Sequence, residues 1–430
     1  MSHFAALTAS TMAAASAAGA MAQFARRRIG GVEILSAPTK GTGLNVALFS
    51  GNYNCVCDGA NRALNRLVAH MTAEGAQVRI YSPVVDEPAF QPTGQLVGVP
   101  SLSIPGRSEY RVALGLPQAV KTDLEAFAPD IIHVSAPDLL GRAAQRYASE
   151  HSTPVVASYH TRFETYFEYY GLGVLRYGVE RWLRQFYARS DRILVPTSAV
   201  RDDMICWGLG ERTRIWSRGV DGEMFSPALR DMGWRRSLGY RDTDVVPLFL
   251  GRLVLEKGLG YFVDAIARVR EWGYRMRPLI VGDGPARSWL AERLPNAVFV
   301  GHLSGIELGM AVASADILLN PSLTEAFGNV TLEAMASGIA IVCPDVGSTR
   351  DLVRNEWSAL MVEPNADAFA EALARLADDE PGRLAMGRAA HFASRAHSWP
   401  RINDAVVECY RELLAERMPE GARVRQSCGA

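Results

Sequence analysis

The chain has 430 residues, of which 48% are hydrophobic, and its formal net charge is −1. This length exceeds one ordinary domain and fits two domains of roughly 200 residues each. The hydrophobic fraction excludes a disordered protein, and the near-zero charge predicts no basic surface that follows a phosphate backbone. We therefore expect a globular two-domain protein without a nucleic acid partner.

The cysteines and the N-terminal segment predict neither a metal site nor an export signal. The six cysteines lack the paired spacing of metal ligands, so we predict no metal and reduced thiols in a cytoplasmic protein. No run of 18 or more apolar residues is present, which argues against a transmembrane helix. The Ala-rich start lacks the basic residues and the apolar core of a signal peptide. We expect residues 1–40 to form a poorly ordered extension.

From residue 41 to residue 225, short apolar runs alternate with helical segments, a pattern that predicts a parallel sheet covered by helices. The expected strands of this N-terminal domain are Asn45–Phe49, Val78–Tyr81, Ile131–Val134, Val155–Tyr159 and Ile193–Pro196. Helices are expected between these strands, among them Ala60–Glu74 and Leu139–Ser149.

Two positions at the carboxyl edge of this sheet are candidate site residues. Gly51 follows the first strand, where a glycine either permits close approach of a donor diphosphate or serves only the turn. His160 follows a later strand, and it is either an active-site histidine or a histidine satisfied within the structure. His133, inside PDIIHV, is expected to pack beneath the sheet edge and to take no part in catalysis.

The segment 160–192 is dense in aromatic residues and arginines. On a helix over 174–187, an apolar stripe would lie beside a row of arginines, a pattern typical of a helix on an anionic membrane surface. The candidate residues for contact with a membrane and a lipid acceptor are Arg176, Arg181, Trp182, Arg184 and Phe186. A core helix with a solvated basic face has the same pattern, so both interpretations stay open.

The pattern breaks near Ser226 and Pro227, so we place a second domain over residues 226–398. Its expected strands are Val246–Leu250, Leu279–Val281, Val298–Val300, Ile317–Asn320, Ile339–Val342 and Ala359–Val362. The predicted fold class is α/β, with two doubly wound, Rossmann-like domains that face a cleft between their strand ends. In residues 399–430 we expect a helix over Ile402–Leu414 and then a tail.

The strand that ends at Leu250 leads into GRLVLEKGLG, in which Arg252 and Lys257 flank a glycine-rich turn. Because parallel strands place such turns at one edge of the sheet, the two cations predict a diphosphate site there. Surface charges without a ligand are the alternative. Gly282, in VGDGPAR, ends the next strand and is a weaker sign of the same site, because Gly-x-Gly is often only a tight turn.

The segment EAFGNVTLEAMASG places Glu325 before a turn and Glu333 inside the helix that follows, and Gly338 ends that helix. The unpaired N–H groups at the start of this helix attract phosphate. A carboxylate repels phosphate, so the two glutamates need other partners, and the hydroxyls of a sugar and a ribose are suitable ones. An ordinary turn and helix with two solvated glutamates is the alternative.

These segments resemble the family-4 retaining glycosyltransferases, which have the GT-B fold, and in particular bacterial lipid-directed hexosyl- and mannosyltransferases. The resemblance covers about residues 44–414 and rests on GRLVLEKG, VGDGP, NPSLTEAFGNVTLEAMASG, CPDVGSTRDLV, PDIIHV and SRGVDGEMF. It implies that the final helix packs back on the N-terminal, acceptor-side domain, and that the second domain binds the nucleotide sugar.

The same resemblance implies a role for each candidate residue. Arg252 and Lys257 would hold the donor diphosphate, Glu325 and His160 would contact the transferred sugar, and Glu333 would bind the ribose. The backbone amides expected to cover sugar and phosphate are those of Phe327, Gly328, Asn329 and Val330.

The implied activity is transfer of a hexose from a UDP- or GDP-linked sugar, which is a substrate, so no cofactor is expected. Protein cations would stabilise the departing diphosphate, so no metal is expected either. A membrane lipid such as diacylglycerol is the expected acceptor, which would place the enzyme at the inner face of the cytoplasmic membrane. A soluble or polysaccharide acceptor stays open. A non-catalytic protein that binds sugar nucleotides is the alternative from another class.

Overall fold

The computed structural model describes residues 25–29, 32–36, 43–56, 59–104, 107–160, 176–325 and 327–417. These residues divide into two compact units. The first unit holds the described residues up to Tyr159, those of Trp182–Leu194 and those from Val406 on, and the second holds the rest. The domain boundaries expected at residues 40, 225 and 398 stay a prediction.

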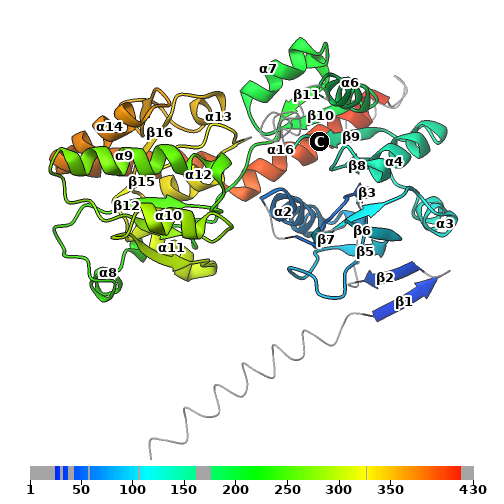
Figure 1. Ribbon diagram of the computed structural model, residues 1–430. Coiled ribbons are helices and arrows are strands. Elements are labelled where there is room, and N and C mark those ends of the chain that lie inside the picture. The colour runs from blue at the N-terminus through cyan, green and yellow to red at the C-terminus, as the bar shows by residue number, and fades with distance from the viewer. Residues whose placement is uncertain are drawn as a thin grey trace, which may run out of the picture. The chain divides into compact units, whose positions relative to one another are not determined.

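The first part of the chain forms a sheet whose central strands are parallel. In chain order its elements are β1 (Ala25–Ile29), β2 (Val32–Ser36), β3 (Asn45–Phe49), α2 (Gly59–Ala73), β4 (Gln77–Ser82), β5 (Gln95–Gly98), β6 (Ser101–Ile104), β7 (Arg107–Ala113), α3 (Gln118–Phe127), β8 (Ile131–Val134), α4 (Leu139–Glu150), β9 (Val155–Ser158), α6 (Arg176–Tyr187), β10 (Arg192–Val195), α7 (Ser198–Cys206), η3 (Gly210–Arg212) and β11 (Thr213–Ile215) (Figure 1). Among the described residues, the strands of the main sheet follow the order β1-β2-β5-β4-β3-β8-β9-β10-β11. Strands β6 and β7 pair separately as an antiparallel hairpin.

Strand β3 lies between β4 and β8 and pairs with both in parallel. The side chains of β8 and β9 are buried throughout, as expected for apolar runs in a parallel sheet that helices cover on both faces. The N-terminal stretch for which we expected poor order contains β1 and β2, an antiparallel pair that continues the sheet beyond β5. The rest of residues 1–40 lies outside the described residues.

The second part of the chain forms a six-stranded sheet within the described residues. Its elements are η4 (Pro227–Leu229), α8 (Met232–Ser237), β12 (Pro247–Leu250), η5 (Leu255–Lys257), α9 (Leu259–Glu271), β13 (Leu279–Val281), α10 (Arg287–Arg293), β14 (Val298–Gly301), α11 (Gly305–Ala313), β15 (Ile317–Leu319), α12 (Asn329–Ala336), β16 (Ala340–Pro344), α13 (Gly347–Arg350), β17 (Leu360–Val362), α14 (Ala366–Asp378), α15 (Glu380–Ser394), η6 (Arg395–His397) and α16 (Trp399–Arg417). The strand order is β14-β13-β12-β15-β16-β17, and every pair is parallel.

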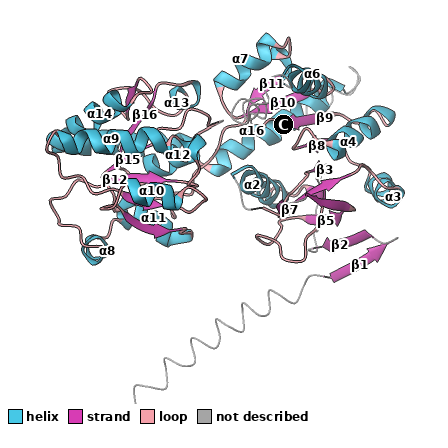
Figure 2. Ribbon diagram, in the orientation of Figure 1, coloured by secondary structure: helices cyan, strands magenta, loops and turns pink. Residues whose placement is uncertain are grey.

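Alternate residues of these strands belong to two hydrophobic cores, one on each face of the sheet. One core joins Phe249 and Ile317 to residues of α9 and α14. The other joins Leu248 and Leu318 to residues of α11 and α12. Figure 2 shows the helices of this unit (cyan) around its strands (magenta). The predicted doubly wound α/β fold is therefore confirmed, because helices cover both faces of a parallel sheet.

Helix α16 contributes to both units. Its residues up to Ala405 belong to the second unit, and those from Val406 on belong to the first. In the first unit, the Tyr410 hydroxyl contacts Nδ1 of His133, and Nε2 of His133 contacts the Ser158 hydroxyl. His133 has no exposed surface, as the sequence predicts for a packing residue.

No helix in the part of the chain that the structure describes is both long and apolar enough to cross a membrane. Four cysteines are described, Cys55, Cys206, Cys343 and Cys409, and all are free thiols.

Candidate active site

The second sheet changes direction at one point, and the predicted donor residues lie there. The chain builds β12 first, adds β13 and β14 on one side, and then returns to add β15 on the other. Ligands of doubly wound sheets bind outside the carboxyl ends of the strands at such a point. Arg252 and Lys257 follow β12, and Glu325 follows β15, so the sheet order brings these separate segments to one edge.

Lys257 and Glu325 form an ion pair at this edge. The Lys257 Nζ donates a hydrogen bond of 2.6 Å to Glu325 Oε1. The side chains are 32% and 18% exposed, so the pair is reachable by a ligand yet partly shielded from water. An ammonium group carries three N–H donors, and one bond to Glu325 leaves two for phosphate oxygens. Arg252 is exposed on the same turn.

Backbone contacts fix the turns that carry these groups. The Thr324 hydroxyl donates to the carbonyl oxygen of Glu256 at 3.4 Å, which ties the loop after β15 to the turn after β12. Gly282 has a φ of 136°, and a Cβ there would lie only 1.9 Å from the carbonyl oxygen of Gly251. The predicted Gly-x-Gly therefore keeps the ends of β12 and β13 close together, which only a glycine allows.

Helix α12 begins at the same edge. Its N-cap is Gly328, which has a φ of 100° and offers no side chain to cap the helix. The Thr331 N–H donates to the Gly328 carbonyl at 3.0 Å, and no side chain caps the N–H groups of Asn329 and Val330 before it. The helix dipole favours an anion at this end. Phe327 is buried beneath this turn, whereas Asn329, Val330 and Glu333 are partly exposed. The Asn320 side chain donates to the Thr331 hydroxyl at 3.0 Å and holds the helix against β15.

The corresponding edge of the first sheet carries Gly51 and a carboxylate that we did not single out from the sequence, Asp138. A Cβ on Gly51 would lie 2.4 Å from Asp138 Oδ2, so a larger residue at that position would force the carboxylate to move. Asp138 Oδ1 accepts a 2.7 Å hydrogen bond from the Gly141 N–H and caps α4. Burial raises the pKa of the Asp138 carboxyl to about 6, although the hydrogen bonds from backbone N–H groups oppose this shift.

His160 is held by a second residue that sequence reasoning missed, Arg218. The Arg218 Nη2 donates a 2.7 Å hydrogen bond to His160 Nδ1. A guanidinium only donates, so Nδ1 accepts and a neutral His160 carries its proton on Nε2. Arg218 is 4% exposed, its guanidinium lies 5.2 Å from the centre of the Trp216 ring, and Nη1 donates to the Trp216 carbonyl. The assignment of His160 to sugar binding stays a prediction.

Helix α6 matches only part of the predicted membrane face. Arg181 and Arg184 are exposed, and Trp182 is 38% exposed. The expectation for Phe186 is wrong: it is 1% exposed, and its ring lies against Gly141 within the first unit. The side chain of Arg176 lies outside the described residues.

Comparison with known proteins gives the family. The model described as Glycosyltransferase Family 4 matches residues 57–223, and the model described as Glycosyl transferases group 1 matches residues 244–379. A GDP-mannose-dependent alpha-mannosyltransferase of Mycolicibacterium smegmatis is 31% identical over 381 residues, which are 87% of this chain and 99% of the relative. The chain belongs to the family-4 glycosyltransferases.

Two further proteins are similar to this glycosyltransferase. An alpha-monoglucosyldiacylglycerol synthase of Streptococcus pneumoniae is 25% identical over 312 residues, which are 70% of each chain. The solved structure of sucrose-phosphate synthase from Thermosynechococcus elongatus shares the fold, with a TM-score of 0.71, 20% identity, and coverage of 87% of this chain and 100% of that one. The fold is therefore GT-B, as predicted.

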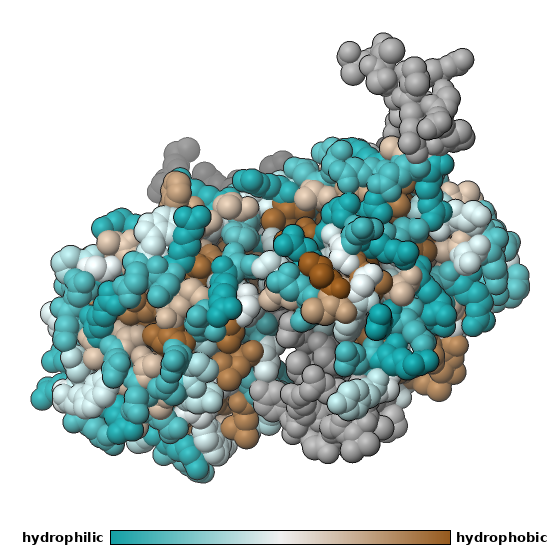
Figure 3. Space-filling view, turned by 90° about the horizontal axis from the view of Figure 1, so that it is seen from above, coloured by the Kyte–Doolittle hydropathy of each residue, from teal (hydrophilic) through white to brown (hydrophobic). Residues whose placement is uncertain are grey.

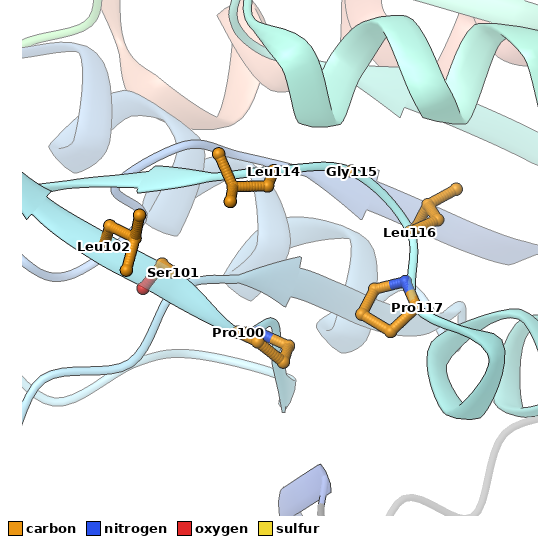
Figure 4. Close-up of a pocket in the computed structure, with 7 residues that line it drawn as sticks. All are labelled: Pro100, Ser101, Leu102, Leu114, Gly115, Leu116 and Pro117. Carbon is orange, nitrogen blue, oxygen red and sulfur yellow. The ribbon is translucent and has the colours of Figure 1, made fainter.

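A pocket in the glycosyltransferase lies apart from these clusters, at the open end of the β6–β7 hairpin. Its volume is about 390 Å³, and no donor-side residue lines it. Figure 4 shows the residues that line it: Pro100, Ser101, Leu102, Leu114, Gly115, Leu116 and Pro117. Ser101 supplies the one hydroxyl among these side chains.

Within the described residues, no group of three or more His, Cys, Asp or Glu side chains could hold a metal ion.

Proposed function

We propose that this glycosyltransferase moves mannose from GDP-mannose to a hydroxyl of a membrane lipid such as diacylglycerol, with retention of the anomeric configuration. The Lys257–Glu325 pair beside the open start of α12 carries this proposal. It places a cation suited to diphosphate and a carboxylate suited to sugar hydroxyls within 2.6 Å of each other. The donor follows the name of the M. smegmatis relative, and the lipid follows that of the S. pneumoniae relative.

The chemistry requires stabilisation of the leaving group. Negative charge develops on the diphosphate as the bond to the anomeric carbon breaks. Lys257, Arg252 and the amides at the start of α12 stabilise that charge, and donors already held in place do so without reorganisation. Glu325 binds sugar hydroxyls, and Glu333 binds the ribose. Because the protein supplies the positive charge, transfer proceeds without a metal.

Attachment to the membrane relies on charge. Arg181 and Arg184 are exposed on α6, and anionic lipid attracts such residues. On the face shown in Figure 3, hydrophobic residues form small patches separated by hydrophilic ones. The enzyme therefore binds the inner face of the cytoplasmic membrane peripherally, with Trp182 as the aromatic contact of α6.

Product analysis tests the proposal. The enzyme is incubated with GDP-mannose, UDP-glucose or UDP-galactose and with either dioleoylglycerol in phosphatidylglycerol vesicles or a free hexose, with and without excess EDTA. We expect a mannosylated lipid from GDP-mannose, unaffected by EDTA, with an α-linkage by NMR. Activity lost in EDTA and restored by magnesium would contradict the metal-free mechanism. Transfer only to free hexoses would indicate a soluble acceptor, and binding of nucleotide without turnover would indicate a non-catalytic protein.

A further inference from the structure

The first sheet has its own reversal point, and a carboxylate lies there. The chain builds β3, adds β4 and β5 on one side, and then returns to add β8 on the other. The Ser135 N–H donates to the carbonyl oxygen of Phe49 at 2.9 Å, so the carboxyl ends of β3 and β8 stay together. Gly51 follows β3 and Asp138 follows β8, at the edge where doubly wound sheets bind ligands.

The two reversal points of this enzyme differ in charge. The second sheet presents Lys257 and Glu325, a pair that suits a diphosphate and a sugar. The first sheet presents the Asp138 carboxylate beside Gly51. An ionised carboxylate accepts hydrogen bonds and repels phosphate, so this edge suits a hydroxyl group. Diacylglycerol has such a free hydroxyl.

We infer that Asp138 is an acceptor-binding residue, whose Oδ2 accepts a hydrogen bond from a hydroxyl of the acceptor. The inference rests on the proposed function, since it assigns the acceptor side of that reaction. Oδ1 caps α4 through Gly141, and Oδ2 lies on the side of Gly51, where the acceptor hydroxyl would reach it.

The competing role for Asp138 is helix capping alone. A variant that keeps the cap but loses the charge distinguishes capping from acceptor binding. Burial raises the pKa of the Asp138 carboxyl, so its ionised form is less favourable in the folded protein than in the unfolded chain. Stability from this group is therefore full below its unfolded pKa and is lost as the pH rises through about 6. Asparagine caps helices as well as aspartate does and carries no charge. Asp138→Asn should therefore melt at or above the wild-type temperature at pH 7.

The test compares Asp138→Asn with wild type in three assays at pH 7: mannosyl transfer to dioleoylglycerol in phosphatidylglycerol vesicles, hydrolysis of GDP-mannose without acceptor, and thermal unfolding. We expect kcat/KM for the lipid to fall at least about 10-fold through a higher KM, with donor hydrolysis unchanged. Asp379→Asn is the matched control, because Asp379 caps α15 through Gly382 at 2.9 Å and lies outside the site. Asp138→Ser, which also retains a capping oxygen, replaces Asp138→Asn if that variant folds poorly.

Each outcome is decisive. If wild type and Asp138→Asn use the lipid equally well, Asp138 is only a cap and the inference is overturned, while the proposed function stands. If wild type glycosylates a free hexose in place of the lipid, the same comparison is made with that hexose. If wild type hydrolyses the donor but glycosylates neither acceptor, the proposed function fails, and the role of Asp138 fails with it.

Discussion

At the scale of single residues, the proposed mechanism gives the Lys257 ammonium two partners at once. Without a donor it neutralises the Glu325 carboxylate at 2.6 Å. In the proposed mechanism, two N–H groups of Lys257 would reach phosphate oxygens of the bound donor while one stays with Glu325. Lys257 would then both bind the leaving group and fix the orientation of the Glu325 carboxylate toward the sugar.

Replacing this cation should impair chemistry without impairing folding. We expect Lys257→Ala, and likewise Arg252→Ala, to lower kcat/KM for transfer roughly 10²-fold or more, about 3 kcal/mol of transition-state stabilisation. Steady-state kinetics together with thermal unfolding measure both effects. Lys121→Ala, on α3, is the control for loss of a lysine. Near-normal rates in both donor-side variants would remove the diphosphate assignment.

Replacing each of the two glutamates should affect GDP binding and mannosyl transfer differently. Glu325→Ala removes the partner of Lys257, which frees the ammonium for phosphate, so we expect GDP to bind as well as before or tighter while mannosyl transfer falls. Glu333→Ala removes hydrogen bonds from ribose hydroxyls to a charged group, worth about 1.5–3 kcal/mol, so the Kd for GDP should rise about 10- to 100-fold. Calorimetric titration of GDP and UDP into both variants measures this, and the reverse pattern would exchange the two roles.

The sequence singles out the candidate donor residues because each lies in a short local motif at the end of a strand. Arg252 and Lys257 share one turn, and Glu325 and Glu333 flank another. Asp138 and Arg218 were not singled out, since their contacts with Gly51 and His160 join segments that are distant in the sequence. Arg218 meets His160 across 58 positions of the chain, and only the folded sheet brings the two together.

At the scale of elements, the apolar runs of buried strands predict position well. Asn45–Phe49, Ile131–Val134 and Leu279–Val281 were predicted with the bounds that the structure has. The hairpin of β6 and β7 was missed, although Pro105-Gly106 between two alternating segments is a turn signal that could have revealed it. The periodicity of α6 could not show that Phe186 is buried while Trp182 is partly exposed. Both residues lie on one face of the helix, and periodicity does not show which neighbours cover that face.

Charge reversal on α6 should release the enzyme from membranes. Arg181 and Arg184 are exposed, and each arginine near an anionic surface contributes on the order of 1 kcal/mol. In sedimentation with phosphatidylglycerol vesicles at low salt, we expect wild type in the pellet and Arg181→Glu/Arg184→Glu in the supernatant. At high salt, wild type should also be found in the supernatant. Donor hydrolysis should be unchanged in the variant.

The control for that experiment reverses two exposed arginines elsewhere, Arg270→Glu/Arg388→Glu, on α9 and α15. If wild type stays in the supernatant at every salt concentration, α6 is an ordinary helix with a solvated basic face. The acceptor would then be sought among soluble compounds.

At the scale of the whole molecule, helix α16 links the two compact units through one continuous backbone. Its part in the first unit is tied to β8 and β9 by the buried contacts of His133 with Tyr410 and Ser158. Further along, Arg417 donates to Asp191 at 2.6 Å and to the Ser152 carbonyl at 2.9 Å. The sequence predicted a helix here and the packing role of His133, but not these partners, because they lie up to 277 positions apart.

The burial of His133 makes stability depend on pH. Burial lowers the pKa of His133 to about 3, against about 6.5 in the unfolded chain. The neutral ring therefore contributes stability that is full above pH 6.5 and is lost as the pH falls toward 3. Between pH 7 and pH 5 this group should lower the free energy of unfolding by about 2 kcal/mol.

Replacing the ring isolates that contribution. His133→Gln is less stable than wild type at pH 7, because it loses contacts inside the core, but its stability should fall less on acidification. We expect the difference in unfolding free energy between the two proteins to shrink by about 2 kcal/mol from pH 7 to pH 5, measured by urea denaturation. Acidification raises stability through Asp138, because its pKa is raised in the folded protein. Both proteins contain Asp138, so this effect cancels in the difference between them. A gap that stays constant with pH would mean that His133 becomes protonated in the folded protein, and that the junction between α16 and the first unit accommodates its charge.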